Sequence, residues 1–329
     1  MIKKAKITGT GSYLPERVLT NQDLEKMVDT TDEWIVSRTG MKERRIARPD
    51  EFSSHMGAAA ALKALAAAHL DASQVDFILV ATLTPDCPIP STACLIQKMI
   101  GAPQAGAVDI SAACTGGLYA LSLARALILS GTYKNVLVIC SEKLSSFTDY
   151  TDRSTCVLFG DGASAYVVSS EGRGLAIEQI QLGADGEQAE LLVIPGGGCR
   201  QPTSAVTIEN RLHFIKMSGN EVFKHAVRRM EAACKECLDA ADCKEEEISW
   251  LIPHQANVRI IDAIAKRFPH LPGDRIYKTV HKYGNTSASS CGIALDELLK
   301  THTVHPGEKI LLTAFGSGLT WGAALLRAE

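Results

Sequence analysis

The chain has 329 residues, 46% of them hydrophobic, and a formal net charge of -3 at pH 7. This length supports a large core in one to three domains, and the small net charge gives no sign of a nucleic-acid-binding protein. No uninterrupted apolar run reaches the roughly 20 residues that cross a bilayer, and the opening run MIKKAKI lacks the apolar core of a secretory signal. We therefore expect a cytoplasmic protein that binds neither membrane nor nucleic acid.

Apolar runs of strand length alternate with helical patterns, which predicts a layered α/β architecture. The predicted strands are residues 75–82, 136–140, 163–168, 249–253 and 310–314. The predicted helices are residues 53–68, 118–129, 219–241, 256–268 and 289–299.

The first candidate functional residue in chain order is Cys114, in the run SAACTGG at 111–117. An apolar stretch ends there and the predicted helix 118–129 begins, so the thiol lies where backbone N–H groups are unpaired and the helix macrodipole is positive. Both effects favour the thiolate, so we expect a lowered pKa and a usable nucleophile. A buried cysteine that only packs the turn is the alternative.

The other cysteines are scattered through apolar stretches, which is typical of core residues in a reducing compartment. Cys234 and Cys237, with Cys243 nearby, form the one cluster with metal-like spacing. No second pair or neighbouring histidine completes four ligands, so we expect no metal site.

The order of elements occurs twice: a strand, a helix start rich in small residues, an apolar helix and a second strand. This weak duplication predicts two similar halves, residues 1–172 and residues 173–329. If a pseudo-twofold axis relates them, Cys114 and Asn285 occupy equivalent helix starts that face one cleft. His254 follows the predicted strand 249–253, and active sites of α/β sheets tend to lie beyond the carboxyl ends of strands.

His254 and Asn285 each have an ordinary structural explanation. His254 lies in IPHQAN at 252–257, where Pro253 fixes its approach, and a hydrogen-bonded structural histidine is the alternative to a catalyst. Asn285 lies in YGNTSAS at 283–289, where a helix N-cap is the alternative. The matched places of these residues and Cys114 in the two halves favour a joint site.

Seven segments carry a more specific pattern: GTGSYLP at 9–15, TDEWIVSRTG at 31–40, DISAAC at 109–114, FGDGA at 159–163, KMSGNEVF at 216–223, PHQAN at 253–257 and GNTS at 284–287. In this order they resemble the thiolase-fold condensing enzymes, specifically the β-ketoacyl-[acyl-carrier-protein] synthase III family, which initiates type II fatty-acid synthesis. The likeness extends over essentially the whole chain. It implies a thiolase-like fold of five layers, α-β-α-β-α, with two pseudo-symmetric halves, and a homodimer formed through the first half.

The resemblance also implies an acyltransferase. The expected reaction is decarboxylative Claisen condensation of a short-chain acyl-CoA, such as acetyl-CoA, with malonyl-acyl-carrier protein, giving 3-ketoacyl-acyl-carrier protein, CO₂ and CoA. In this ping-pong scheme Cys114 carries the acyl group, and His254 and Asn285 donate hydrogen bonds to the enolate that decarboxylation leaves. The backbone N–H groups of Cys114 and Ser317 form the oxyanion hole, with serine where many relatives have glycine. No metal or cofactor is implied.

The family's binding residues carry over by position. The residues that match contacts to CoA are Thr30, Trp34, Arg38, Arg153, Gly219, Phe223 and Asn257. Trp34 and Arg153 match the pair that grips the adenine by stacking and cation–π contact. For Trp34, core packing is the alternative.

The acyl-carrier protein is acidic, so its docking surface should be basic. Arg259 matches the family's main docking arginine, and Lys224 and Arg228 lie one helical turn apart. An ordinary solvated surface is the alternative. Ile89, in the loop 84–92, matches the residue that enters the acyl pocket of the partner subunit.

Two other functions remain open. A synthase of secondary metabolism with the same fold would load a different starter, or transfer acyl groups to oxygen or nitrogen. A non-catalytic CoA- or carrier-binding protein would keep the fold without the chemistry. The presence of Cys114, His254 and Asn285 together favours carbon–carbon bond formation.

Overall fold

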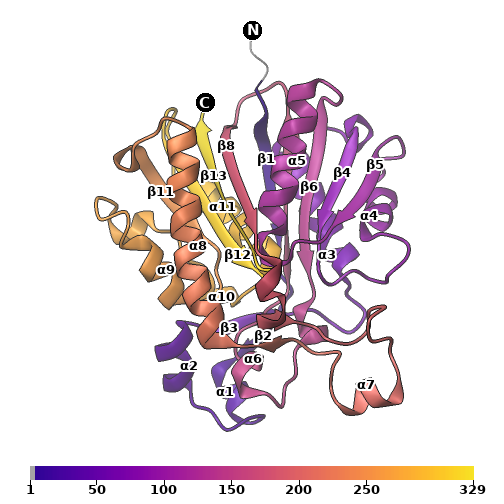
Figure 1. The fold of residues 1–329 in the computed structure, drawn as a ribbon. Helices are drawn as coiled ribbons and strands as arrows, with labels where there is room; N and C mark the ends of the chain where they lie inside the picture. The colour runs from indigo at the N-terminus through magenta and orange to yellow at the C-terminus, as the bar shows by residue number, and fades with distance from the viewer. Residues whose placement is uncertain (1–3) are drawn as a thin grey trace.

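A computed structural model describes residues 4–329. Nine strands form one mixed sheet in the order β11-β12-β13-β8-β1-β7-β6-β4-β5. Figure 1 shows β1 and β8 side by side near its middle, with β11 and β5 toward opposite edges. Two small sheets, β2-β3 and β10-β9, lie apart from it.

The strands of the large sheet are β1 (Lys6–Tyr13), β4 (Phe77–Ala81), β5 (Gly106–Ile110), β6 (Asn135–Glu142), β7 (Gly162–Ser169), β8 (Leu175–Ala184), β11 (Ile248–Pro253), β12 (Lys309–Gly316) and β13 (Thr320–Ala328). The strands of the small sheets are β2 (Arg17–Thr20), β3 (Glu43–Ile46), β9 (Leu192–Val193) and β10 (Lys216–Met217). The helices are α1 (Asn21–Glu25), α2 (Asp32–Thr39), α3 (Ser53–Ala67), α4 (Thr92–Ile100), α5 (Gly116–Ser130), α6 (Arg153–Cys156), α7 (Ala205–Glu209), α8 (Gly219–Ala240), α9 (Val258–Ala265), α10 (Val280–Tyr283) and α11 (Ser290–Thr301).

The helices and the two halves of the sheet form five layers. α3 packs on β1, β7 and β6, and α8 packs on β13, β8 and β12. α5 and α11 lie between, because each contacts strands of both halves: α5 touches β6 and β8, and α11 touches β7 and β11. The expected α-β-α-β-α arrangement is therefore confirmed. The buried hydrophobic residues form separate clusters on the α3 side, on the α8 side and around α5 and α11.

The predicted strands and helices all form, with ends that differ by a few residues. The sequence pattern missed β1 because Gly9 and Gly11 interrupt its apolar alternation. Both glycines allow α3 to approach β1 closely: a Cβ atom would lie 2.3 Å from the carbonyl oxygen of Ala64 at Gly9, and 2.4 Å from that of Ala60 at Gly11. The glycines of β1 therefore mark close packing of the backbone against α3, and not an alternation of buried side chains that would predict a strand.

The boundary expected at residues 172 and 173 falls in the turn between β7 and β8. Across that turn the sheet is continuous, because Lys6 and Ile7 of β1 pair with Ala176 and Leu175 of β8. The division into residues 1–172 and 173–329 therefore remains a prediction about two halves that share one sheet.

The expected equivalence of Cys114 and Asn285 is wrong by three residues. Cys114 is the middle residue of the short 3-10 helix η2 (Ala113–Thr115), which runs into α5, and the matching helix η7 (Ser287–Ser289) runs into α11. Each begins with a non-glycine residue at positive φ, 47° at Ala113 and 50° at Ser287. Ala288 therefore occupies the place that corresponds to Cys114, and Asn285 precedes the turn.

One segment, Ala113–Ser130, is long and apolar enough to cross a membrane by length and composition. The segment is not an uninterrupted apolar run, because Arg125 lies within it. In the structure α5 lies between the two halves of the sheet, with Leu118, Leu121 and Ile128 almost completely buried. The composition of this segment fits a core helix.

Candidate active site

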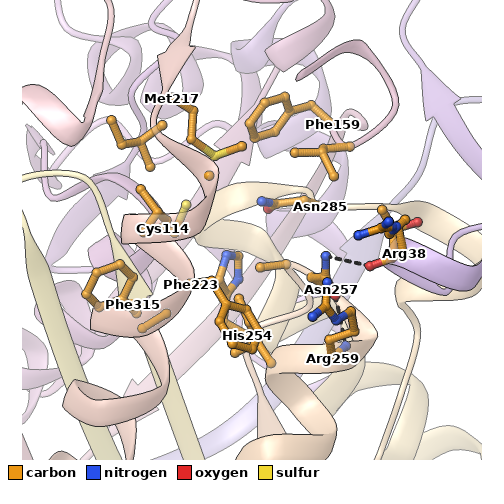
Figure 2. Close-up of a pocket in the computed structure, with 18 of the residues that line it drawn as sticks. Arg38, Cys114, Phe159, Met217, Phe223, His254, Asn257, Arg259, Asn285 and Phe315 are labelled. Atoms are coloured by element: carbon orange, nitrogen blue, oxygen red, sulfur yellow. Dashed lines mark hydrogen bonds between the residues drawn. The ribbon is translucent and has the colours of Figure 1, made fainter. Parts of the chain in front are cut away.

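Both halves of the chain contribute to one cavity of about 300 Å³. Its wall contains Cys114, His254 and Asn285. Figure 2 shows the Cys114 sulfur, the His254 ring and the Asn285 carboxamide around the same space. The three residues predicted to act together thus meet at one site, although long stretches of chain separate them.

The turn that carries Cys114 is held against the second half. A Cβ atom on Gly316, at the end of β12, would lie 2.7 Å from the Cys114 backbone nitrogen, so only glycine allows this approach. Thr115 Oγ1 donates a hydrogen bond to Thr320 Oγ1 at 2.7 Å, and Thr320 Oγ1 donates to the Ser317 carbonyl oxygen at 3.0 Å. These contacts fix the position of the sulfur relative to the turn after β12.

Burial raises the pKa of the Cys114 thiol to about 12. The sequence predicted the opposite direction from a helix start at the cysteine. The regular helix α5 instead begins at Gly116. Cys114 is partly exposed at the cavity wall, but desolvation of its thiolate by the surrounding protein outweighs the effect of the helix terminus. The sulfur therefore rests as a neutral thiol and must lose its proton as it attacks.

His254 is buried directly after β11, and its backbone N–H donates to the Thr313 carbonyl oxygen at 2.7 Å. Its Nδ1 lies 2.6 Å from Ser290 Oγ, which leaves Nε2 for the cavity. Burial lowers the pKa of His254 to about 4, so the ring is neutral at pH 7. With Ser290 as the donor to Nδ1, the ring proton is on Nε2, and His254 offers the cavity a neutral donor.

Asn285 is oriented by the turn that follows it. Its Oδ1 accepts a hydrogen bond from the Ser287 backbone N–H at 2.8 Å, which leaves the Nδ2 amino group as its donor toward the cavity. Its backbone is held as well, because Asn285 N donates to the Leu158 carbonyl oxygen and Gly160 N donates to the Asn285 carbonyl oxygen. The capping alternative is thus compatible with a free donor, since the cap uses only the oxygen.

A second cavity, of about 190 Å³, shares Cys114 and includes the predicted oxyanion residue Ser317. The Ser317 hydroxyl donates to the Leu192 carbonyl oxygen, which fixes the turn on this wall. The remaining wall is mostly apolar: Leu83, Leu144, Phe159, Leu192, Val193, Ile194 and Ile215. Sequence reasoning missed this cavity, although the short apolar runs around Leu192 and Ile215, set in a polar and Gly-rich stretch, were a usable signal.

Five of the seven predicted CoA contacts line the larger cavity: Trp34, Arg38, Gly219, Phe223 and Asn257. Asn257 Nδ2 donates to the Arg38 carbonyl oxygen at 3.1 Å, as Figure 2 shows. Thr30 and Arg153 lie outside this wall. The Arg153 guanidinium lies over the Trp34 ring, 5.0 Å from its centroid, so the pair expected to hold a base between them is in direct contact.

The residues expected to dock the carrier protein do not all lie at the cavity. Arg259 lies at the cavity wall, with its guanidinium 5.3 Å from the centroid of the Phe223 ring. Lys224 pairs with Glu221 at 2.8 Å, and the exposed Arg228 lies outside the wall. Ile89 is 87% exposed and lines neither cavity of its own chain.

Comparison with known proteins identifies the family of the chain. Residues 108–186 match the family model of 3-oxoacyl-[acyl-carrier-protein] synthase III, and residues 238–328 match the model of its C-terminal part. The chain is 59% identical to the β-ketoacyl-[acyl-carrier-protein] synthase III of Chlamydia muridarum, over 98% of this chain and 99% of the relative.

Among solved structures, the chain resembles 3-oxoacyl-[acyl-carrier-protein] synthase III from Aquifex aeolicus, with 51% identity, a TM-score of 0.90 and coverage of 98% and 99% of the two chains. It also resembles the priming β-ketosynthase of the R1128 polyketide pathway, with 34% identity, a TM-score of 0.91 and coverage of 99% and 97%. The thiolase-like fold is thereby confirmed, and the chain belongs to the β-ketoacyl-[acyl-carrier-protein] synthase III family.

Proposed function

We propose that this chain initiates fatty-acid synthesis by condensing a short-chain acyl-CoA with malonyl-acyl-carrier protein. The observation that carries the proposal is the single cavity where a thiol, a neutral imidazole and a carboxamide donor meet. The test is direct: purified protein incubated with acetyl-CoA and malonyl-acyl-carrier protein is expected to release CO₂ and CoA and to form 3-ketoacyl-acyl-carrier protein. Absence of this product with intact, folded protein would contradict the proposal.

In the first half-reaction the Cys114 sulfur attacks the thioester carbonyl carbon of acyl-CoA, and CoA leaves. The negative charge that develops on the carbonyl oxygen needs donors, which the backbone N–H groups of Cys114 and Ser317 supply. The contact of Gly316 with Cys114 supports this assignment, because it brings the two segments together.

In the second half-reaction malonyl-acyl-carrier protein loses CO₂ and leaves an enolate. His254 Nε2 and Asn285 Nδ2 stabilise its oxygen, and the carbanion carbon then attacks the acyl carbon on Cys114. Neutral donors suit this task, because they stabilise the developing charge without giving up a proton to the carbanion. The pKa of His254, lowered by burial to about 4, keeps it in that form across the physiological range. These steps use only side chains and backbone donors, so no metal or cofactor is invoked.

Each of the two cavities is proposed to hold a different part of the substrate. The larger one leads from Trp34 to Cys114 and fits the pantetheine arm of CoA or of the carrier protein. The smaller one starts at the same sulfur, is mostly apolar and fits the acyl group. Arg259, Lys224 and Arg228 are proposed to receive the acidic carrier protein.

Replacing Trp34 with alanine is expected to raise the KM for acetyl-CoA about tenfold and to leave kcat nearly unchanged. Stacking of one base on an aromatic ring contributes about 1–3 kcal/mol, and this contact is far from the reacting atoms. Initial-rate kinetics with varied acetyl-CoA measure both constants. Phe52→Ala removes an exposed aromatic ring that lines neither cavity and is the matched control. An unchanged KM in Trp34→Ala would remove Trp34 from the CoA site.

A homodimer formed through the first half completes the proposal. β5 is an edge strand, and Met99 on α4, Val108 on β5 and Leu123 on α5 are exposed hydrophobic residues of this half. An exposed apolar edge of this kind favours pairing with a second copy. Ile89 would then enter the acyl cavity of the partner. Sedimentation equilibrium is expected to give about twice the mass of the chain, and a monomer at micromolar concentration would contradict the dimer.

The primary pathway is favoured over secondary metabolism by the names of the curated relatives. Curated relatives named for the synthase III reaction are 46–59% identical to the chain. The polyketide priming enzyme, at 34%, lies within the 33–51% range of solved structures named synthase III. We therefore propose a role in fatty-acid synthesis, and the cytoplasm remains its expected location. A polyketide role would show as a preference for a starter other than short acyl-CoA.

A further inference from the structure

A buried carboxyl group lies behind the nucleophile. Glu142, the last residue of β6, has no exposed surface. Its Oε2 accepts three hydrogen bonds: from Thr84 Oγ1 at 2.8 Å, from Leu83 N at 3.1 Å and from Thr82 Oγ1 at 3.3 Å. Within residues 4–329, no group forms a hydrogen bond with its other oxygen, Oε1. One oxygen of this carboxyl is therefore anchored, and the other is free to take a proton.

Ser287 connects this carboxyl with Cys114. The helix η7, which begins with Ser287, packs on both η2 and β6, so it lies between the two groups. The Ser287 hydroxyl lowers the pKa of both the Cys114 thiol and the Glu142 carboxyl, so it lies against both groups. Its Oγ is buried and has no hydrogen bond of good geometry within the described chain. Ser287 also lines the smaller cavity beside Cys114. Within the described chain, two buried polar atoms without hydrogen bonds of good geometry, Ser287 Oγ and Glu142 Oε1, thus lie near the sulfur.

Buried polar atoms without partners are costly, and this pair is adjacent to a thiol that must lose its proton. We propose that Glu142 takes up the proton that Cys114 releases during acyl transfer, and that the Ser287 hydroxyl passes it on. This inference rests on the proposed function, and it assigns a proton path to a step that His254 and Asn285 do not serve. Glu142 touches neither substrate nor reacting atoms, so it acts through Ser287.

The step balances in protons and electrons. As the sulfur–carbon bond forms, the Cys114 thiol proton moves to Ser287 Oγ, and the Ser287 hydroxyl proton moves to Glu142 Oε1. The tetrahedral intermediate collapses, the bond from carbon to the CoA sulfur breaks, and CoA leaves with that electron pair. The proton on Glu142 returns to Ser287 Oγ, and the Ser287 hydroxyl gives a proton to the departing CoA sulfur, so Glu142 is again an anion.

The relative basicity of the neighbouring groups agrees with this path. Burial raises the pKa of Glu142 to about 7, whereas burial lowers that of His254 to about 4, so the carboxylate is the stronger base. The charge of Glu142 raises the pKa of the neighbouring thiols of Cys114 and Cys140. The adjacent Lys143 ammonium is directed elsewhere, toward the backbone oxygens of Arg48 and Glu51. The residues at the end of β4 that bind Glu142, Thr82 to Thr84, carry no charge.

The proposed proton path fixes the direction in which the rate of acylation changes with pH. The path needs Glu142 as an anion, so the rate of Cys114 acylation by acetyl-CoA is expected to rise with pH through about 7 and then level off. Glu142→Gln keeps the shape and the anchored oxygen but accepts no proton. It should slow acylation at pH 8 at least tenfold and remove the inflection. If Glu142 had a purely structural role, Glu142→Gln would instead lower the rate by the same factor at every pH.

The experiment is single-turnover acylation, followed by rapid quench and mass spectrometry, from pH 5.5 to 9. Ser287→Ala should reproduce the slow, flat profile, which keeps the test valid if Glu142→Gln fails to fold. Glu51→Gln, a change of a buried carboxyl outside both cavity walls, is the matched control and should keep the wild-type profile. Malonyl decarboxylation, measured separately, should be unaffected in the Glu142 and Ser287 variants.

Two outcomes distinguish the inference from the proposed function. Wild-type rates and an unchanged inflection in both Glu142→Gln and Ser287→Ala would overturn the proton path and leave the condensing activity intact. Absence of acylation in the wild-type protein would overturn the proposed function itself.

Discussion

Replacing Cys114 with serine is expected to lower the rate of acyl transfer from acetyl-CoA by about 10⁴-fold or more, because loss of the nucleophile removes the covalent intermediate. A serine hydroxyl at the same place is a much weaker nucleophile, and the enclosed site does not help it to ionise. Single-turnover labelling with radioactive acetyl-CoA measures this step. Overall synthesis of 3-ketoacyl-acyl-carrier protein should be lost in parallel.

The same variant provides its own control. Decarboxylation of malonyl-acyl-carrier protein depends on His254 and Asn285, so Cys114→Ser should still release CO₂ without forming a condensation product. Cys140→Ser changes another buried thiol near α5 and should continue to acylate. An acyl-enzyme that forms at the normal rate in Cys114→Ser would refute the assignment of the nucleophile.

Replacing Asn285 with alanine is expected to leave acylation intact and to slow condensation by about 10²–10³-fold, the usual effect of removing one preorganised donor. Nδ2 is the only donor that this side chain directs to the cavity, because Oδ1 is engaged by the Ser287 N–H at 2.8 Å. Acylation and CO₂ release, measured separately on the same preparation, distinguish the two half-reactions.

A companion variant separates donor loss from disturbance of the turn. Asn285→Asp keeps an oxygen that can accept from the Ser287 N–H, but it removes the amino group. If the donor matters, both variants lose condensation. If Asn285→Asp condensed normally, Asn285 would be a capping residue alone, as the sequence also allowed.

Local patterns in the sequence were sufficient for the alternation of strands and helices. The five layers and the three convergent residues were expected from the resemblance to the family. Apolar runs and amphipathic periods mark strands such as β6 and helices such as α8, and the ordered motifs around Cys114, His254 and Asn285 are specific. The strand β1 was missed because its signal is the close approach of α3 at Gly9, which depends on a distant segment.

The electrostatics of the site could not be predicted locally. The direction of the Cys114 pKa depends on enclosure by both halves, and a sequence shows only the adjacent helix start. Glu142 was not singled out for the same reason: it ends an apolar strand, and only the fold places η7 between it and the sulfur. The smaller cavity likewise combines Leu144, Leu192 and Ile215 from three segments.

The most direct test of the whole account is the location of the acyl group during turnover. Purified protein is incubated with acetyl-CoA alone, digested and examined by mass spectrometry, and a second sample is first chased with malonyl-acyl-carrier protein. We predict one acetyl group on the peptide that contains Cys114, and its complete loss in the chase with release of CO₂. Acetyl label on another residue, or label on Cys114 that the chase does not remove, would contradict the mechanism.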